Sequence, residues 1–444
     1  MWRVPTYAVG DLQRAGVVRR AQPERIFTAA ALLETATDPL VASEWWRAAI
    51  GADREEPPGP GKPVTVVDSG VDVTHPEFSS RPNTTLLNEQ TTSEEDEDHG
   101  TEVTSVLAAP NNGIGLVGVY PDAVVRVWDA SPFGFLNEGS AIRGIVEAAG
   151  RGPGVINLSF GGEENDPMLQ EAVMLAVRSG SLVVAAVGNE GFEGSPANFP
   201  ASYPHVLTAG ATNDTGHVAG FSSLSQFVDV VAPGVRIPVA EPITTELSGY
   251  SVASGTSFAA PLVAGAAAWV WTRRPDLDNT QLFELMRRSA TDIGDPGFDS
   301  SSGAGLINIP AALGFKTPSR DPQEPNEQPN EIEPNGLFPS GTVPLTTPGH
   351  RSAVLAARVD RHEDPLDLYR AWAPPRMKLN ARVNGPVAVR ILPRAPREKK
   401  PLAVGKHALA TYVNKGRRGI YVYVEIRPSV RVAEYTLRLT TARR

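Results

Sequence analysis

The stretch SGTSFAAPLVAGAAAWVW, residues 254–271, has almost no polar side chain after its first four residues. A helix on a protein surface carries a polar face, so an apolar run of this length predicts a helix buried in a large core. Ser257 then lies at the start of that helix. A serine at such a place is commonly a cap, and the rest of the chain decides whether this one does more.

Short runs rich in Val, Ile and Ala alternate with amphipathic stretches between residues 64 and 234. Strand-like runs include VTVVDSG (64–70), GVINLSF (154–160), SLVVAAVGN (181–189) and VDVVAPG (228–234), and GSAIRGIVEAAG (139–150) and PMLQEAVMLAVRSG (167–180) are helix-like. This alternation predicts an α/β fold: a doubly wound, mostly parallel sheet with helices on both faces. Functional sites in such sheets gather where strands end and helices begin.

The last third of the chain has a different pattern. Residues 316–336, KTPSRDPQEPNEQPNEIEPNG, are rich in Pro, Glu and Asn, and we expect a linker that buries nothing. Beyond it, alternating strand-like runs without helices predict a small antiparallel β-sandwich over residues 337–444. The predicted division is an N-terminal arm (1–43), an α/β domain (44–315), the linker (316–336) and the sandwich (337–444).

Composition narrows the chemistry of this 444-residue chain. It contains no Cys, which excludes disulfides, a thiol nucleophile and Cys-based metal sites. No apolar run reaches transmembrane length, and the first residues lack the basic start and apolar middle of a signal peptide.

Charge is divided unevenly along the chain. Residues 337–444 carry 21 basic and 7 acidic residues, and residues 1–336 carry 20 and 43. Two interpretations stay open: each region is solvated by its own charges, or the basic region docks on the acidic one or on a polyanion. Solvation is the simpler interpretation.

Four polar residues stand where the predicted fold would expose them at one edge of its sheet: Asp68 and Asn189 end strand-like runs, and His99 and Ser257 open helix-like ones. Singly, each has an ordinary structural explanation as a cap or a turn residue. Together they supply the groups that acyl transfer needs. His99 would take the proton of the Ser257 hydroxyl, and Asp68 would orient and stabilise the imidazolium. The Asn189 amide and the Ser257 backbone N–H would stabilise the oxyanion.

These residues lie, in this order, within VVDSGVDVTHPEF (66–78), HGTEVTSVLAA (99–109), VGNEG (187–191) and SGTSFAAPLVAGAAA (254–268). The set resembles the subtilisin-like serine proteases, the subtilases (peptidase S8 type). The resemblance implies a secreted serine endopeptidase with Asp68, His99 and Ser257 as its triad and Asn189 as oxyanion donor. It also implies protein or peptide substrates in extended conformation, no nucleic acid partner and no cofactor for catalysis.

The resemblance extends to substrate binding and to a structural metal. NLSFGG places Ser159, Phe160, Gly161 and Gly162 along the pocket for the residue before the scissile bond, although the two glycines could simply make a turn. SPFGFLN (131–137) is similar to the opposite edge strand. The loop PNNGIGLVGVYPDA (110–123) is similar to a structural calcium loop, with the Asn112 side chain and the carbonyls of Pro110, Ile114 and Leu116 as ligands. Glu77 stands where Asp is usual, so calcium stays an open question and the metal ligands are unknown.

Both ends of the chain have weaker counterparts. Residues 8–27 are similar to the end of an inhibitory propeptide, and an ordinary surface arm explains them equally well. The sandwich resembles the pre-peptidase C-terminal type of accessory domain.

One departure from the family bears on catalysis: the acidic run Glu94–Asp98 leads directly into His99, where Gly is usual. Such a run either is solvated or moves the onset of base catalysis to higher pH. Two other functions stay open, a catalytically silent binding protein on a protease fold and an esterase. Both are ranked below the endopeptidase, because all four catalytic groups are present and a peptide can pair with strand edges.

Overall fold

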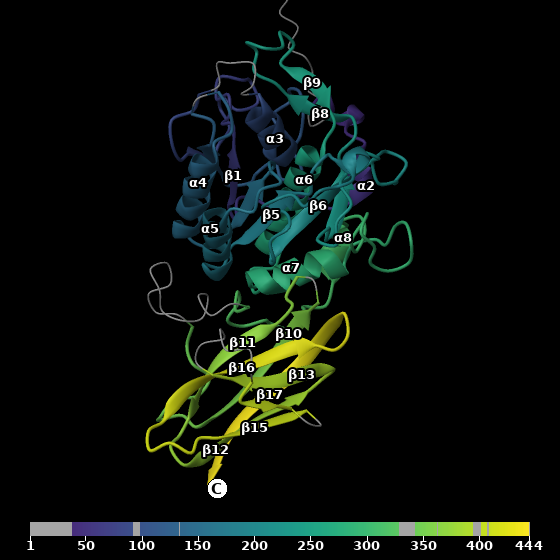
Figure 1. Ribbon diagram of the computed structural model, residues 1–444. Helices are drawn as coiled ribbons and strands as arrows, with labels where there is room; N and C mark the ends of the chain where they lie inside the picture. The colour runs from purple at the N-terminus through teal and green to yellow at the C-terminus, as the bar shows by residue number, and fades with distance from the viewer. Residues whose placement is uncertain are drawn as a thin grey trace, which may run out of the picture. The chain divides into compact units, whose positions relative to one another are not determined.

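The computed structural model describes residues 38–91, 98–132, 134–327, 342–361, 363–393, 401–405 and 408–443 (Figure 1). The predicted N-terminal arm therefore lies outside the described residues except for 38–43, which include the 3₁₀ helix η1 (Val41–Ser43). The described residues belong to one compact unit, Asp38–Arg444.

A seven-stranded parallel sheet forms the centre of the α/β region, in the order β2-β3-β1-β4-β5-β6-β7. Its strands are β1 (Val64–Asp68), β2 (Thr84–Leu86), β3 (Val125–Asp129), β4 (Val155–Leu158), β5 (Leu182–Ala186), β6 (Val206–Thr212) and β7 (Val230–Pro233). A small antiparallel pair of strands, β8 (Ile237–Ala240) and β9 (Tyr250–Ala253), follows β7 in the sequence. The predicted doubly wound parallel sheet is confirmed.

Helices cover both faces of the sheet, because the strands are apolar on both sides. On β5, Leu182 and Val184 belong to one core cluster and Val183 and Ala185 to the other, the alternation that a pleated strand imposes. The first cluster includes residues of α2 (Trp46–Ile50), α3 (His99–Ala108), α6 (Thr256–Arg273), α7 (Asn279–Arg288) and α8 (Ile309–Gly314). The second includes residues of α4 (Glu138–Gly150) and α5 (Pro167–Arg178). A short 3₁₀ helix, η3 (Gly191–Glu193), follows β5.

Helix α6 is the predicted buried helix. From Phe258 to Trp271 its side chains are all buried, including the two large indoles of Trp269 and Trp271. It lies within the fold in Figure 1, between α3 and the sheet. None of the described helices is long and apolar enough to cross a membrane.

The sheet order reverses direction at β1, since the chain passes from β3 on one side of β1 to β4 on the other. Open parallel sheets bind their ligands at the carboxyl ends of the strands near such a reversal. Asp68 is the last residue of β1 and Ser159 directly follows β4, so both lie at this place.

The C-terminal region is an antiparallel sandwich of two four-stranded sheets, as predicted. One sheet has the order β10-β17-β12-β15, formed by β10 (Ser352–Asp360), β17 (Val432–Arg443), β12 (Met377–Asn384) and β15 (Leu409–Val413). The other has the order β11-β16-β13-β14, formed by β11 (Asp367–Ala373), β16 (Ile420–Pro428), β13 (Val387–Leu392) and β14 (Ala403–Val404). Side chains of both sheets share one apolar core.

The expectation that residues 316–336 bury nothing was wrong for their described part. Asp321, Glu324 and Asn326 are all buried. The Asn326 amide oxygen accepts a hydrogen bond from the Leu368 N–H at 2.7 Å, which ties this stretch to β11. Composition alone does not show this, because the burial of a polar side chain depends on segments that are distant in the chain. Residues 328–336 lie outside the described part.

Candidate active site

Asp68 and His99 meet at the carboxyl edge of the sheet. Asp68 is fully buried at the end of β1, and its Oδ1 accepts hydrogen bonds from the Ser69 N–H and from His99 Nδ1, both at 2.8 Å. Because the carboxylate can only accept, His99 Nδ1 carries the proton. The other ring nitrogen, Nε2, is thereby left as the basic one.

A close approach of two backbones makes this pairing feasible. A β-carbon on Gly100 would lie 2.0 Å from the Gly70 carbonyl oxygen, so only glycine fits directly after His99. The Gly100 N–H also donates to Ser69 Oγ at 2.9 Å. The start of α3 is therefore held against the loop that follows β1.

Ser257 lies in the first turn of α6 and is partly exposed. Its Oγ donates to the Ser159 carbonyl oxygen at 3.1 Å, and Ser159 Oγ donates to the Ser257 carbonyl oxygen at 2.9 Å. Within the described residues no hydrogen bond joins Ser257 to His99, but the His99 ring lies 6.1 Å, between ring centroids, from the ring of Phe258. The imidazole thus faces the start of α6 while the serine hydroxyl is bonded elsewhere.

The side chain of Asn189, just after β5, is held in one orientation. Its Oδ1 accepts hydrogen bonds from the Thr256 N–H at 2.9 Å and from Thr256 Oγ1 at 3.0 Å. Its Nδ2 is therefore directed away from Thr256, and it lies 3.6 Å from the place of a β-carbon on Gly255. Thr256, which is fully buried, was missed in the sequence, where its only signal was its place beside Ser257.

The residues expected along the substrate pocket follow β4. Gly162 pairs with Phe199 in an antiparallel bridge, with N–H···O distances of 3.0 and 2.8 Å. A β-carbon on Gly161 would lie 2.0 Å from Asn198 Oδ1, so the glycine is needed for close contact rather than for a turn alone. Phe160 packs on the apolar core beside α4 and α5.

Two polar residues near this pocket were not predicted. A β-carbon on Gly188 would lie 2.3 Å from Glu190 Oε2 and 2.4 Å from Asn198 Nδ2, so both side chains pack against the backbone before Asn189. Only the position of Glu190 beside Asn189 could have signalled it. The described residues of SPFGFLN (131–137) form an irregular loop rather than the expected edge strand, and Phe133 lies outside the described part.

The electrostatic surroundings favour a protonated His99. Burial lowers the pKa of His99, but the carboxylates of Asp68 and Glu102 raise it by more, to about 9. Burial also raises the pKa of Glu102 to about 7. Of the acidic run Glu94–Asp98, only Asp98 is described; it accepts a hydrogen bond from Thr245 Oγ1 at 2.9 Å, and the other four residues lie outside the described part.

Glu77 contacts the loop that is expected to hold calcium. The buried Glu77 Oε1 accepts hydrogen bonds from the Leu116 N–H at 2.8 Å and from the Tyr250 hydroxyl at 3.0 Å. Its Oε2 faces Asn112 Nδ2 at 3.4 Å, and Asn112 Oδ1 accepts the Ile114 N–H at 3.0 Å. In this structure the side-chain oxygens of Glu77 and Asn112 thus accept hydrogen bonds, and calcium binding by this loop stays a prediction.

Comparison with known proteins agrees with this geometry. Residues 59–305 match the family described as the Subtilase family. Subtilisin NAT of Bacillus subtilis subsp. natto is 39% identical over 255 residues, which are 56% of this chain and 65% of that protein. Subtilisin of Bacillus pumilus is 38% identical over 255 residues, which are 56% of this chain and 90% of that protein.

Solved structures give the same fold. The psychrophilic subtilisin-like protease Apa1 of the Antarctic Pseudoalteromonas sp. AS-11 matches with a TM-score of 0.54 and 18% identity, over 62% of this chain and 99% of that one. Sphericase matches with a TM-score of 0.51 and 26% identity, over 59% of this chain and 96% of that one. The family match ends at residue 305, so the likeness of the sandwich to a pre-peptidase C-terminal domain stays a prediction. With its sheet, its Asp-His pair and a family match spanning more than half of its length, this chain belongs to the subtilase family.

Proposed function

We propose that this protein is a serine endopeptidase that hydrolyses peptide bonds through an acyl-enzyme intermediate. The observation that carries the proposal is the Asp68–His99 pair, which faces the start of α6 where Ser257 lies. Family membership supports the same reaction class.

In the first step Ser257 Oγ leaves its hydrogen bond to the Ser159 carbonyl and turns toward His99. Catalytic hydrogen bonds are often long or poorly aligned in a free enzyme and tighten only when substrate is bound. His99 Nε2 takes the hydroxyl proton while Oγ attacks the scissile carbonyl carbon. Asp68 holds the ring through Nδ1 and stabilises the imidazolium, which then gives its proton to the leaving amine.

Two donors stabilise the oxyanion of the tetrahedral intermediate. One is Asn189 Nδ2, which Thr256 orients by binding Oδ1. The other is the Ser257 backbone N–H at the positive end of α6. Because both donors are placed before the substrate binds, little reorganisation is required in the transition state. Water then attacks the acyl-enzyme by the same proton transfers through His99, which releases the acid product and restores Ser257.

The substrate we propose is an extended protein or peptide segment. Backbone groups of Ser159, Phe160, Gly161 and Gly162 would line the pocket for the residue before the scissile bond. No nucleic acid partner is needed for this reaction, and catalysis requires no cofactor. By family resemblance we place the protein outside the cell.

The test is labelling with a fluorophosphonate, followed by mass spectrometry of the labelled peptide. We expect label on Ser257 and none in Ser257→Ala, and we expect Ser257→Ala to lose casein hydrolysis. Native protein that is not labelled between pH 7 and about 10, the range in which the His99 base becomes neutral, would refute the proposal. Peptides cut from a protein mixture would then give the cleavage preference.

A further inference from the structure

A cluster of four carboxylates lies far from the proposed catalytic residues, where the linker stretch meets the sandwich. Asp321 and Glu324 come from the linker, Asp364 from the loop after β10, and Asp367 from the start of β11. One carboxylate oxygen of each lies within 4.8 Å of the others. All four residues are at least nine-tenths buried, with exposed fractions of 5%, 8%, 2% and 0%.

Asp364 is the residue that points to a ligand. Neither of its carboxylate oxygens has a hydrogen-bond partner among the described residues, although the side chain is 2% exposed. Asp321 Oδ2, Glu324 Oε2 and Asp367 Oδ1 likewise receive no hydrogen bond from the described part of the chain. Buried polar atoms are nearly always hydrogen-bonded, so five such oxygens in one place need a partner.

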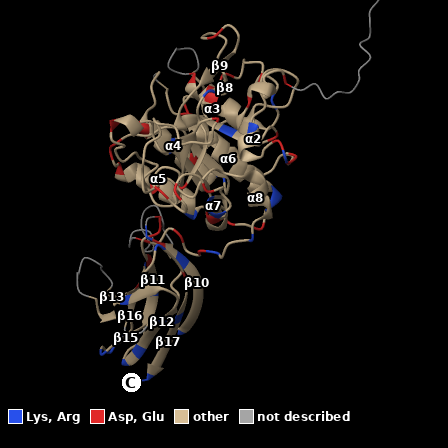
Figure 2. Cartoon of the chain, turned by 90° about the vertical axis from the view of Figure 1, so that its right-hand side faces the viewer, with Lys and Arg blue, Asp and Glu red and all other residues tan. Residues whose placement is uncertain are grey.

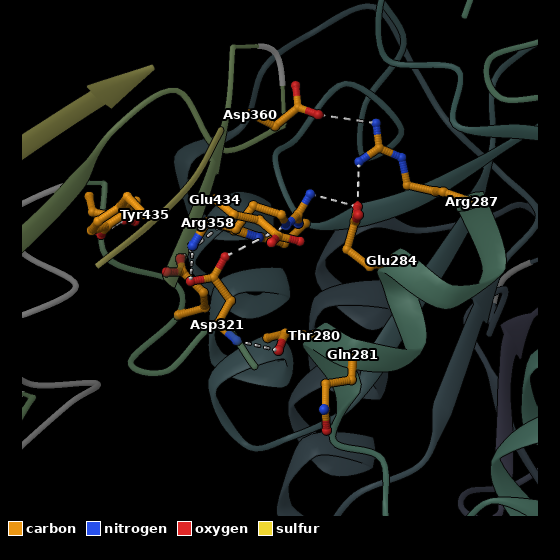
Figure 3. A network of polar contacts seen from close by, with 12 residues as sticks. Thr280, Gln281, Glu284, Arg287, Asp321, Arg358, Asp360, Glu434 and Tyr435 are labelled. Carbon is orange, nitrogen blue, oxygen red and sulfur yellow. Dashed lines mark hydrogen bonds and ion pairs between the residues drawn. The ribbon is translucent and has the colours of Figure 1, made fainter. Parts of the chain in front are cut away.

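The neighbouring cations do not supply that partner. Arg358 lies 3.9 Å from Asp321 but makes its close contact, 2.7 Å, with Glu284 of α7 (Figure 3). Arg287 is engaged with Asp229 at 2.9 Å, and also with Glu284 and Asp360. His205 lies 3.4 Å from Glu324 Oε2, but its Nε2 is bonded closely to Glu327. Four carboxylates thus face one another with little compensation, which is costly away from water.

We propose that Asp321, Glu324, Asp364 and Asp367 bind one calcium ion, which fastens the linker to the sandwich. Calcium takes about 6–8 oxygen ligands at about 2.3–2.6 Å, so oxygens on opposite sides of the ion lie about 5 Å apart, close to the spacing in this cluster. Magnesium fits less well, because it keeps several of its waters rather than entering an all-protein cage. A cavity of about 20 Å³ borders Asp321, Glu324 and Asp364 and has room for a water ligand.

The site has a mechanical consequence. The linker stretch also donates the Asp321 N–H to Thr280 Oγ1 of α7 at 3.3 Å, and the Arg358 N–H donates to Asp321 Oδ1 at 3.2 Å. An ion at the cluster would therefore hold in place a segment that contacts both the α/β region and the sandwich.

The test uses the full chain as its Ser257→Ala variant, so that self-cleavage does not interfere. Protein stripped with EDTA is titrated with CaCl₂ by calorimetry, and its Tm is followed by circular dichroism. We expect one calcium per chain and a rise in Tm of about 3 °C at calcium about 100-fold above Kd. This readout does not depend on peptidase activity.

Two substitutions locate the ion. Asp364→Asn should lower calcium affinity at least about 10-fold while leaving the Tm of the stripped protein equal or higher, because it removes repulsion. Glu324→Gln should have the same two effects, and it replaces Asp364→Asn in the test if that variant does not fold. Glu77→Gln is the matched control, a buried carboxylate that contacts the loop 110–123 also considered for calcium, and this variant should bind calcium as the parent does.

Three results would overturn the proposal. The first is a stripped protein that binds no calcium. The second is calcium affinity that is lost in Glu77→Gln but kept in Asp364→Asn. The third is stabilisation by zinc rather than calcium that His205→Gln abolishes, which would assign a different site to His205, Glu324 and Glu327.

Discussion

The substitution Glu102→Gln tests how carboxylates around His99 set the pH dependence of the proposed peptidase activity. With a His99 pKa of about 9, the imidazole is mostly protonated at pH 7 and cannot act as a base. The value of kcat/KM should therefore rise about tenfold per pH unit below pH 9, so that activity at pH 7 is about 1% of the plateau.

The size of the Glu102 effect follows from its place on α3. Glu102 is three residues after His99 on the same helix, and side chains at this spacing lie about 6 Å apart. Two unit charges at about 6 Å interact by roughly 1.4–2.8 kcal/mol at an effective dielectric constant of about 20–40, or about 1–2 pKa units. Screening by salt reduces this, and we expect Glu102→Gln to lower the His99 pKa by about 1 unit.

The assay is kcat/KM for a chromogenic peptide from pH 5.5 to 10 at constant ionic strength. Glu102→Gln should move the rising limb about 1 unit to lower pH and leave the plateau unchanged, since Gln still fills the space. Glu147→Gln, which removes an exposed charge from α4, is the control and should leave the profile unmoved. Identical profiles for Glu102→Gln and the parent, or a parental inflection near pH 6.5, would refute the reasoning.

Three further substitutions test the site and the fold. Asn189→Ala should lower kcat about 10²–10³-fold with little change in KM, because an oxyanion donor acts mainly in the transition state; an equal rise in KM would contradict this role. Gly100→Ala should lower the unfolding free energy, measured with urea, by about 1–3 kcal/mol and should reduce kcat by displacing His99. Gly150→Ala is the control: a β-carbon there meets nothing within 4 Å, so both the unfolding free energy and kcat should stay unchanged. Arg287→Gln leaves three buried carboxylates without their shared cation, so it should lower the unfolding free energy by about 3–5 kcal/mol in the same assay. The exposed Arg151→Gln should lower it by only about 0–1 kcal/mol. Equal losses in the two variants would show that burial of the ion pairs does not decide their contribution.

The charge division of the chain shows the limit of composition. In Figure 2 the acidic residues gather on the α/β region, as the counts predict. The contact between Arg358 of the sandwich and Glu284 fits a basic region facing an acidic one. Arg287 with Asp360, and Arg288 with Glu434, pair in the reverse sense. Net charge describes the average field, while ion pairs depend on single side chains at short range.

The sequence by itself determined the α/β sheet, the buried helix, the sandwich and the four candidate catalytic residues. Each of these has a local signal in the sequence. Strands and helices are indicated by the periodicity of apolar residues, and the site by polar residues at the ends of apolar runs. His99 and Asp68 could be paired in advance because sites in such folds gather where strands end and helices begin.

Only the tertiary structure decided which donors occupy the oxygens of Glu77, where Ser257 Oγ points, and how Thr256 orients Asn189. The same is true of the carboxylates around Asp364, two of which, Asp321 and Glu324, lie in the stretch predicted to be a linker that buries nothing. Burial and hydrogen bonding are set by partners distant in the chain, and a short polar stretch carries no sign of which partners it will meet.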